Sequence, residues 1–255
     1  MLNVCYIVND KTDEWFKMSV KQASMIADRF VFVIDRPDSF TWDVLEYAQE
    51  LKPTVLLHAK YLKNSKTADG QFRTVYLDWL KNNSVGDWAL VLDTDEVLSD
   101  NCYHLLSYTR QSLYFCYDIR MVHIWWSLGF EDSTVPKHFV QRRMFKVTPD
   151  LCYPYVEHPL LAGSTSFNIV EDVIIWHMNV VKSLISEIEK YKKQCVKSNM
   201  HTPEMLRSWH FLHILGGNPI SKVNPAGLPG IVREFACIDD KGDPVFYKEV
   251  KKNGV

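Results

Sequence analysis

Three acidic residues, Asp93, Asp95 and Glu96, directly follow a run of five mostly apolar residues, 88–92. An unpaired charge at the end of a buried strand is costly, so such acids usually have a partner. If the backbone stays extended, Asp93 and Asp95 point to the same side. Two carboxylates on one side of a strand end suit a divalent cation such as Mg²⁺ or Mn²⁺, which prefers oxygen ligands. The alternative is that these acids cap the next turn or helix.

The elements that must position these acids alternate regularly along the first hundred residues. Short apolar runs are interrupted by segments in which apolar residues recur with helical spacing. The runs predict strands at 2–8, 29–34, 53–59 and 88–92, and the segments between them predict helices at 14–27, 41–51 and 69–83. Continuous apolar strands that alternate with helices are typical of a parallel sheet covered on both faces. The sequence therefore predicts an α/β fold.

Polar or acidic side chains follow the predicted strands at the points where they end. Asn9 and Asp10 follow the first strand, Asp35 follows the second, a polar loop follows the third, and Asp93 follows the fourth. In open sheets of this kind, ligands bind beyond the carboxyl ends of the strands. We therefore expect a binding site at this edge.

The second half of the chain shows a different pattern, with strand-like segments of mixed, alternating type. It predicts strands at 113–119, 120–126, 138–147 and 172–178, helices at 180–197 and 203–215, and a tail of loops with one short strand. The adjacent Arg142 and Arg143 face opposite sides if they lie in a strand, so one of them could reach a phosphate or an acceptor carboxylate; a surface salt bridge is the alternative. No boundary separates independent domains, which predicts a single domain over 1–255.

Composition limits the classes of partner and compartment. The formal net charge of −2 gives no reason to expect a nucleic acid or an anionic membrane as partner. The N-terminus lacks the pattern of a signal peptide, and no stretch approaches the roughly 18 apolar residues that a membrane span needs. The six cysteines are scattered without a CxxC pair, which indicates reduced thiols. These features predict a cytoplasmic protein without a transmembrane segment.

The segment GDWALVLDTDEVLSD resembles the acidic motif of family-2-type glycosyltransferases with the GT-A fold. Upstream, DGQFRTVYLDWL is similar to the family helix that carries a Gly and an Arg. Downstream, RRMFK, YVEHPLL and IIWHMN resemble the family's Arg-aromatic strand, its His/Glu element and its late His. The resemblance runs in order over roughly 1–197. It implies a GT-A-like domain with a Rossmann-like, mostly parallel sheet, in which 1–100 bind the nucleotide sugar and 101–255, with C-terminal helices, bind the acceptor.

The resemblance also implies roles for individual residues. Donor-binding roles fall on Asn9, Asp35, Arg73, Asp93 and Thr94, and metal-binding roles fall on Asp93, Asp95 and His177. The donor would be a nucleoside-diphosphate sugar, the cation Mn²⁺ or Mg²⁺, and the acceptor a carbohydrate or glycan. The chain departs from the family where Asn9-Asp10 replaces the usual Asn-Glu pair, and where Glu157-His158 reverses the usual His-Glu order.

Sugar transfer from a nucleoside diphosphate sets two chemical demands. A divalent cation can neutralise the leaving diphosphate as a Lewis acid. An inverting transfer, which the resemblance favours, also needs a carboxylate to take the proton of the incoming hydroxyl. Glu157, in the polar interruption YVEHP, is the first candidate for this base. Glu131 and Asp132, in the predicted loop GFEDSTVP, are rivals, and Glu96 could also be recruited.

Other functions compete for the same motif. LVLDTDEV also fits the signature of haloacid-dehalogenase-type phosphatases, in which the first Asp is a nucleophile. That motif normally follows the first strand, whereas three strand-helix units precede it here. A nucleotidyltransferase would need a Gly-rich basic loop after the first strand, and NDKTDEWF contains no glycine. A nucleotide- or sugar-binding module without turnover is the non-enzymatic alternative.

Overall fold

The computed structural model describes residues 1–8, 12, 14–60, 68–110, 113–124, 130–132, 139–154, 161–163, 166–178, 220–222, 229–230 and 232. The chain divides into two compact units, the first with Met1–Met121 and His138–His177 and the second with Val122–Lys137 and Met178–Val255. The single domain with a nucleotide-binding and an acceptor-binding half stays a prediction.

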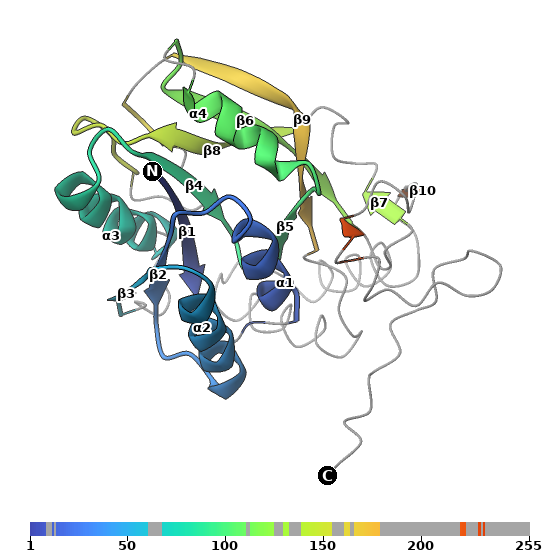
Figure 1. Ribbon diagram of the computed structural model, residues 1–255, viewed down its shortest axis with the longest axis horizontal. Coiled ribbons are helices and arrows are strands. Elements are labelled where there is room, and N and C mark those ends of the chain that lie inside the picture. The colour runs from blue at the N-terminus through green and yellow to red at the C-terminus, as the bar shows by residue number, and fades with distance from the viewer. Residues whose placement is uncertain are drawn as a thin grey trace, which may run out of the picture. The chain divides into compact units, whose positions relative to one another are not determined.

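The helices and strands follow one another in the alternating order that the sequence predicts for the first half (Figure 1). In chain order they are β1 (Leu2–Val8), α1 (Glu14–Ala23), β2 (Arg29–Ile34), α2 (Ser39–Leu51), β3 (Thr54–His58), α3 (Ala68–Asn83), β4 (Trp88–Leu92), β5 (Glu96–Leu98), a 3₁₀ turn (Cys102–His104), α4 (Leu105–Arg110), β6 (Cys116–His123), β7 (Phe130–Asp132), β8 (Val140–Lys146), β9 (Phe167–His177) and β10 (Ile220–Lys222).

Eight of these strands form one sheet in the order β3-β2-β1-β4-β8-β6-β9-β5. The strands β1 to β4 are parallel, so their carboxyl ends lie at the same edge. From β8 onward the sheet becomes mixed: β8 runs antiparallel to β4 and β6, and β5 runs antiparallel to β9. This confirms the predicted α/β class with a mostly parallel first half and mixed strands in the second.

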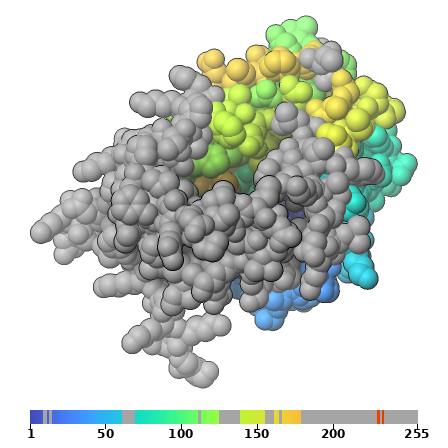
Figure 2. All heavy atoms as spheres, turned by 180° about the vertical axis from the view of Figure 1, so that it is seen from behind, coloured from blue at the N-terminus to red at the C-terminus, as the bar shows by residue number. Residues whose placement is uncertain are grey.

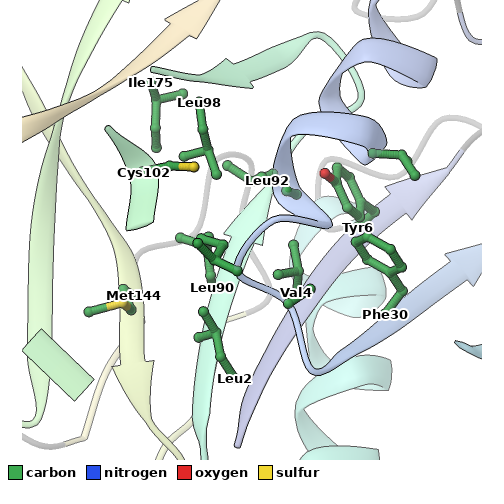
Figure 3. Packing of buried hydrophobic residues seen from close by; sticks show 14 of the residues in the cluster. Leu2, Val4, Tyr6, Phe30, Leu90, Leu92, Leu98, Cys102, Met144 and Ile175 are labelled. Carbon is green, nitrogen blue, oxygen red and sulfur yellow. The ribbon is translucent and has the colours of Figure 1, made fainter. Parts of the chain in front are cut away.

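Apolar side chains cover both faces of the sheet, as continuous apolar strands require. On one face, residues of α1, α2 and α4 join a large cluster with alternate residues of β1, β2 and β4. Figure 3 shows part of it, with Leu2, Val4, Tyr6, Phe30, Leu90, Leu92, Leu98, Cys102, Met144 and Ile175 labelled. On the other face, α3 contributes Phe72, Tyr76, Leu77 and Leu80 to a second cluster. In Figure 2, seen from behind, α3 appears in teal at the right and the strands of the second half in yellow-green to orange above it.

Local interactions explain where helix α2 begins and where helix α1 ends. Helix α2 begins at Ser39, two residues before the predicted start, because the Asp38 carboxylate accepts a hydrogen bond from the Thr41 N–H at 2.9 Å. Helix α1 ends at Ala23 rather than at residue 27. There the Ile26 N–H donates to the Ala23 carbonyl at 3.1 Å, a three-residue spacing that tightens the chain into a turn. The apolar face predicted for this helix is nevertheless buried.

The second half differs from the predicted strands in three places. The strands expected at 113–119 and 120–126 are one continuous strand, β6, because no turn residue interrupts the run. Strand β9 begins at Phe167, five residues before the predicted start. Within the expected loop 129–136, Phe130–Asp132 form β7, which pairs antiparallel with β10 in the second unit. The helices expected at 180–197 and 203–215 lie outside the described residues.

Two predictions about composition can be compared with the structure. Cys5, Cys102, Cys116 and Cys152, the cysteines that the structure describes, are free thiols, as predicted. Among the described residues, none of the helices has the length and apolar character needed to cross a membrane.

Candidate functional site

The site lies at the carboxyl end of β4, where Asp93 sits between two arginines. The Arg73 Nη2, from α3, lies 3.3 Å from Asp93 Oδ1. The Arg143 Nη2, from β8, lies 3.0 Å from Asp93 Oδ2. Strand β8 pairs directly with β4, and Met144 is the partner of Leu90, so the neighbouring Arg143 can extend to the end of β4. Helix α3 and the distant strand β8 thus converge on one carboxylate at the end of β4.

Glu96, the first residue of β5, closes the turn that follows Asp93. Its Oε2 accepts a hydrogen bond from the Asp93 N–H at 3.0 Å, and its own N–H donates to the Asp93 carbonyl at 3.0 Å. Its Oε1 accepts from Arg143 Nη2, the same nitrogen that reaches Asp93. Glu96 is therefore tied to both the backbone and the side-chain partner of Asp93.

Asp93 and Asp95 do not share an extended backbone, contrary to the expectation that both carboxylates point the same way. Thr94 and Asp95 form the turn closed by the hydrogen bond between Glu96 and Asp93. Asp95 Oδ1 lies 3.5 Å from Nε2 of His177, the last residue of β9. The reason is the turn, which directs the two carboxylates to different partners. Asp93 has two guanidinium partners, and Asp95 has an imidazole partner.

Burial and charge shift the pKa values of these groups in different directions. Burial opposes ionisation of Asp93, but Arg143, Arg73 and His177 outweigh it and hold the pKa of Asp93 well below its ordinary value. Burial raises the pKa of Glu96 to about 7, although Arg143 opposes this shift. Burial alone would lower the pKa of His177, but the charge of Asp95 outweighs it and the pKa is raised. Asp93 is thus an anion, and His177 carries a proton more readily than an ordinary histidine.

The side chains on the two sides of the turn differ in the groups that they pair with. Both oxygens of Asp93 are paired with guanidinium groups, so its charge is already balanced. Asp95 and His177 instead form a carboxylate–imidazole pair, and both are side-chain types that can act as metal ligands. Within the described ranges, no group of three or more His, Cys, Asp and Glu residues is arranged to hold a metal ion. The metal-binding roles of Asp93, Asp95 and His177 stay predictions.

The arginines retain unused hydrogen-bonding capacity. The buried Nε–H groups of Arg73 and Arg143 have no hydrogen-bond partner among the residues that the structure describes. The side chain of Asp93 is 37 % exposed, whereas those of Arg73 and Arg143 are 14 % and 6 % exposed. The acid therefore faces outward with two positive charges behind it.

The remaining predicted site residues fall at different places. Asp35 follows β2, is buried, and accepts a hydrogen bond from Arg36 Nε at 3.2 Å. Since β1 lies between β2 and β4, the ends of these two strands are about two strand spacings, or about 10 Å, apart. Thr94 lies in the turn after Asp93. Asn9 and Glu157 lie outside the described residues, and Glu131 and Asp132 lie in β7 of the second unit.

Arg143 is the central residue that the sequence prediction did not assign. Its signal was the Arg142-Arg143 pair, whose side chains do take opposite directions. Arg142 Nε lies 3.1 Å from Asp118 Oδ1, and its guanidinium lies 4.9 Å from the centre of the Phe167 ring. Arg143 instead turns to Asp93 and Glu96. Glu96, considered as a base, is 1 % exposed and engaged by Arg143.

Solved structures with a similar fold include several of TarS from S. aureus. TarS residues 1–349 match with a TM-score of 0.51 at 10% identity, covering 77% of this chain and 64% of that chain. A longer TarS chain matches with a TM-score of 0.50 at 11% identity, covering 85% and 44%. TarS 1–349 in complex with UDP-GlcNAc gives a TM-score of 0.49 at 9% identity, covering 85% and 75%. This chain thus spans less than two thirds of the first two TarS chains.

Sequence comparisons add no relative. No protein-family model matches the chain, and no curated protein matches its sequence. The structural likeness to TarS therefore concerns the fold. Together with the sheet order and the acidic turn after β4, it shows that this chain has a GT-A-like α/β fold.

Proposed function

We propose that the protein is a metal-dependent glycosyltransferase. It moves a sugar from a nucleoside-diphosphate donor to a hydroxyl of a carbohydrate or glycan acceptor, with inversion. The observation that carries this proposal is the outward-facing Asp93 at the carboxyl end of β4, with the buried cations Arg73 and Arg143 behind it. In open α/β sheets, ligands bind beyond such strand ends.

The donor would lie along the edge formed by the ends of β1, β2 and β4. Arg73 would contact the donor diphosphate, and the buried Arg143 adds a second positive charge behind Asp93. Asp93 would accept hydrogen bonds from the ribose, with Thr94 beside it. Asp35, about two strand spacings away, would contact the base or ribose. Asn9, which follows β1, would complete this set.

The acidic turn also supports a role for a divalent cation. Asp95 and His177 would hold Mn²⁺ or Mg²⁺, which would supply Lewis-acid neutralisation of the departing diphosphate. The sign of the His177 pKa shift is relevant to this role, because a protonated imidazole is not a metal ligand. Metal binding at this pair would therefore release the proton that Asp95 favours on His177.

A carboxylate must take the proton of the acceptor hydroxyl in an inverting transfer, a role worth ~100- to 10,000-fold in rate. We assign it to Glu157, with Glu131 and Asp132 as the alternatives. Glu96 is a poorer choice than it was on sequence grounds, because its buried carboxylate is held by Arg143 and the Asp93 N–H. A cytoplasmic location, and the lack of a nucleic-acid partner, stay predictions.

The phosphatase alternative finds less support in the same geometry. A haloacid-dehalogenase-type nucleophile would need an oxygen of Asp93 free to attack phosphorus. Both oxygens of Asp93 are paired with arginines, and each pairing lowers the nucleophilicity of the carboxylate. A binding module without turnover would share every feature of the donor site, so turnover itself must distinguish it.

The proposal is tested by thermal-shift measurements with UDP, GDP, CDP and their sugar derivatives, with and without Mn²⁺. A ligand that binds only the folded protein raises its melting temperature. We expect a rise that needs Mn²⁺ and disappears in Asp95→Ala, followed by release of nucleoside diphosphate from one sugar nucleotide. A shift with Mg²⁺ and a phosphate mimic, but with no nucleotide, would support the phosphatase. Binding without any turnover would support the binding module.

A further inference from the structure

We propose that Glu96 and Arg143 are positioning residues that hold Asp93 in the orientation in which it binds the donor. The inference rests on the proposed function, because that function assigns Asp93 to the donor. It adds a role for two residues that would contact neither sugar nor acceptor. These residues act on the donor through Asp93.

Hydrogen bonds join Asp93, Glu96 and Arg143 in a closed ring that holds Asp93 at two points. Glu96 Oε2 accepts from the Asp93 backbone N–H at 3.0 Å. Glu96 Oε1 accepts from Arg143 Nη2, and the same Nη2 donates to Asp93 Oδ2 at 3.0 Å. The ring thus fixes the backbone of Asp93 through Glu96 and its side chain through Arg143. A residue held at both points loses its freedom about the Cα–Cβ and Cβ–Cγ bonds, which pre-organises the carboxylate.

The ring is anchored in rigid structure on every side. Glu96 begins β5 and pairs in register with His177 of β9. Its carbonyl accepts a hydrogen bond from the Ser19 hydroxyl of α1, and that hydroxyl lies 2.9 Å from the buried hydroxyl of Tyr6 in β1. Arg143 comes from β8, which pairs with β4. Strands and a helix on which a site is built hold its geometry better than loops do.

The burial of the three ring members decreases towards the proposed donor. Glu96 is 1 % exposed, and Arg143, in front of it, is similarly buried. Asp93 is the member that opens to the edge of the sheet. The ring therefore presents one oriented carboxylate outward while its two partners stay inside the protein. Arg73 lies outside the ring and makes a single, longer contact of 3.3 Å with the other oxygen of Asp93.

Stability alone does not account for a charged pair at this position. A buried ion pair is often no more stabilising than apolar side chains of similar volume, because both ions lose their hydration. The neighbouring buried positions of the sheet, such as Met144 and Val97, are apolar. The Glu–Arg pair forms hydrogen bonds to the N–H and the carboxylate of Asp93. Apolar side chains cannot form these bonds.

A double-mutant cycle between Glu96→Gln and Asp93→Ala tests the proposal. We would measure the dissociation constants of UDP, GDP and CDP by calorimetry in the presence of Mn²⁺. We expect Glu96→Gln to weaken the binding nucleotide about tenfold, since a hydrogen bond to a charged group is lost. In the Asp93→Ala background the same change should have no further effect, because the ring acts through Asp93. An equal loss in both backgrounds would overturn the proposal.

A second pair of variants guards against a purely structural effect. Arg143→Lys keeps the positive charge but carries it on a compact ammonium group at the end of a flexible stem, which does not reproduce the fixed position of the guanidinium nitrogen. We expect it to raise the donor KM about tenfold while kcat at saturating donor changes little. Glu50→Gln on the exposed side of α2 is the matched control and should change neither constant. A fall in kcat with an unchanged donor KM would contradict a role in donor positioning.

Hydrogen exchange of the Asp93 amide separates this inference from the proposed function. If none of the three nucleoside diphosphates binds the wild-type protein, the proposed donor site is wrong. Whether the ring holds Asp93 can then still be tested in the protein without a ligand. We expect the Asp93 N–H to exchange at least about tenfold faster in Glu96→Gln, while amides in the centre of β4 stay protected. Unchanged exchange at Asp93 would show that Glu96 does not hold this residue.

Discussion

His177 lies opposite Glu96 in the paired strands β9 and β5, and its Nε2 is 3.5 Å from Asp95 Oδ1. The register of two antiparallel strands therefore brings a late histidine to the acidic turn. The same turn directs Asp93 towards Arg73 and Arg143. The acidic turn is thus divided into an Asp95–His177 pair on one side and Asp93 with its two arginines on the other.

Asp95→Ala is expected to abolish metal-dependent donor binding and leave the fold intact. The change removes the carboxylate partner of His177, so the concentration of Mn²⁺ needed for half-maximal donor binding should rise by about 100-fold or more. Calorimetric titration of Mn²⁺ in the presence of nucleotide measures this. Asp43→Ala, at an exposed position of α2, is the control. Normal Mn²⁺ dependence in Asp95→Ala would refute the metal assignment.

Arg73→Met should weaken donor binding about 10- to 100-fold, because a charge-assisted hydrogen bond to phosphate is lost from a site that keeps its shape. Arg73→Lys should recover part of this loss, since the charge returns without the planar fork. Equilibrium binding of the nucleoside diphosphate compares the three proteins. Equal affinity in all three would move the phosphate contact away from Arg73.

Glu157→Gln should lower turnover by about 100-fold or more while donor affinity changes little, because the acceptor hydroxyl loses its base. Steady-state kinetics with donor and acceptor varied separately distinguishes the two effects. Glu131→Gln and Asp132→Asn serve as parallel variants. If Glu157→Gln keeps full turnover and one of these two loses it, the base lies in β7.

Arg143→Met is expected to destabilise the protein by about 3–5 kcal/mol, since it leaves the Glu96 carboxylate buried without its cation. The double variant Glu96→Leu/Arg143→Met should regain most of this loss, because both charges are then absent. Chemical denaturation gives the free energies of unfolding. If the double variant is no more stable than the single one, the buried charge of Glu96 is not the cause.

The raised pKa of Glu96 predicts a fall in stability with rising pH. The native protein keeps its proton up to about pH 7, whereas the unfolded chain loses it near pH 4.5, so the native state binds more protons between these values. The free energy of unfolding should therefore fall by about 2–3 kcal/mol from pH 4.5 to 6.5. His177, whose pKa is raised above 6.5, keeps its proton across this window.

Glu96→Gln should remove this part of the pH dependence, because glutamine does not titrate. Glu50→Gln, at an exposed position of α2, should leave it unchanged. Denaturation curves at several pH values between 4.5 and 6.5 compare the wild type with both variants. Identical slopes for the wild type and Glu96→Gln would show that another group is responsible.

The strands and helices of the first half could be predicted because their signals are local. A buried parallel strand is a short apolar run, and a covering helix repeats its apolar residues with helical spacing. The acidic groups at strand ends could be placed at one edge for the same reason, since parallel strands end together. The loop predicted around Glu131 was partly wrong, because β7 owes its strand conformation to pairing with the distant β10.

Arg143 and the division of the acidic turn depend on contacts between distant segments. Which of Arg142 and Arg143 faces Asp93 is set by the register of β8, which shifts against β6 between Tyr117 and Asp118. The different partners of Asp93 and Asp95 follow from a turn that Glu96 closes and from the register of β9. Local periodicity indicates which residues reach the edge of the sheet. Their partners there are determined by pairing between strands far apart in the sequence, because hydrogen-bond register carries no local signal.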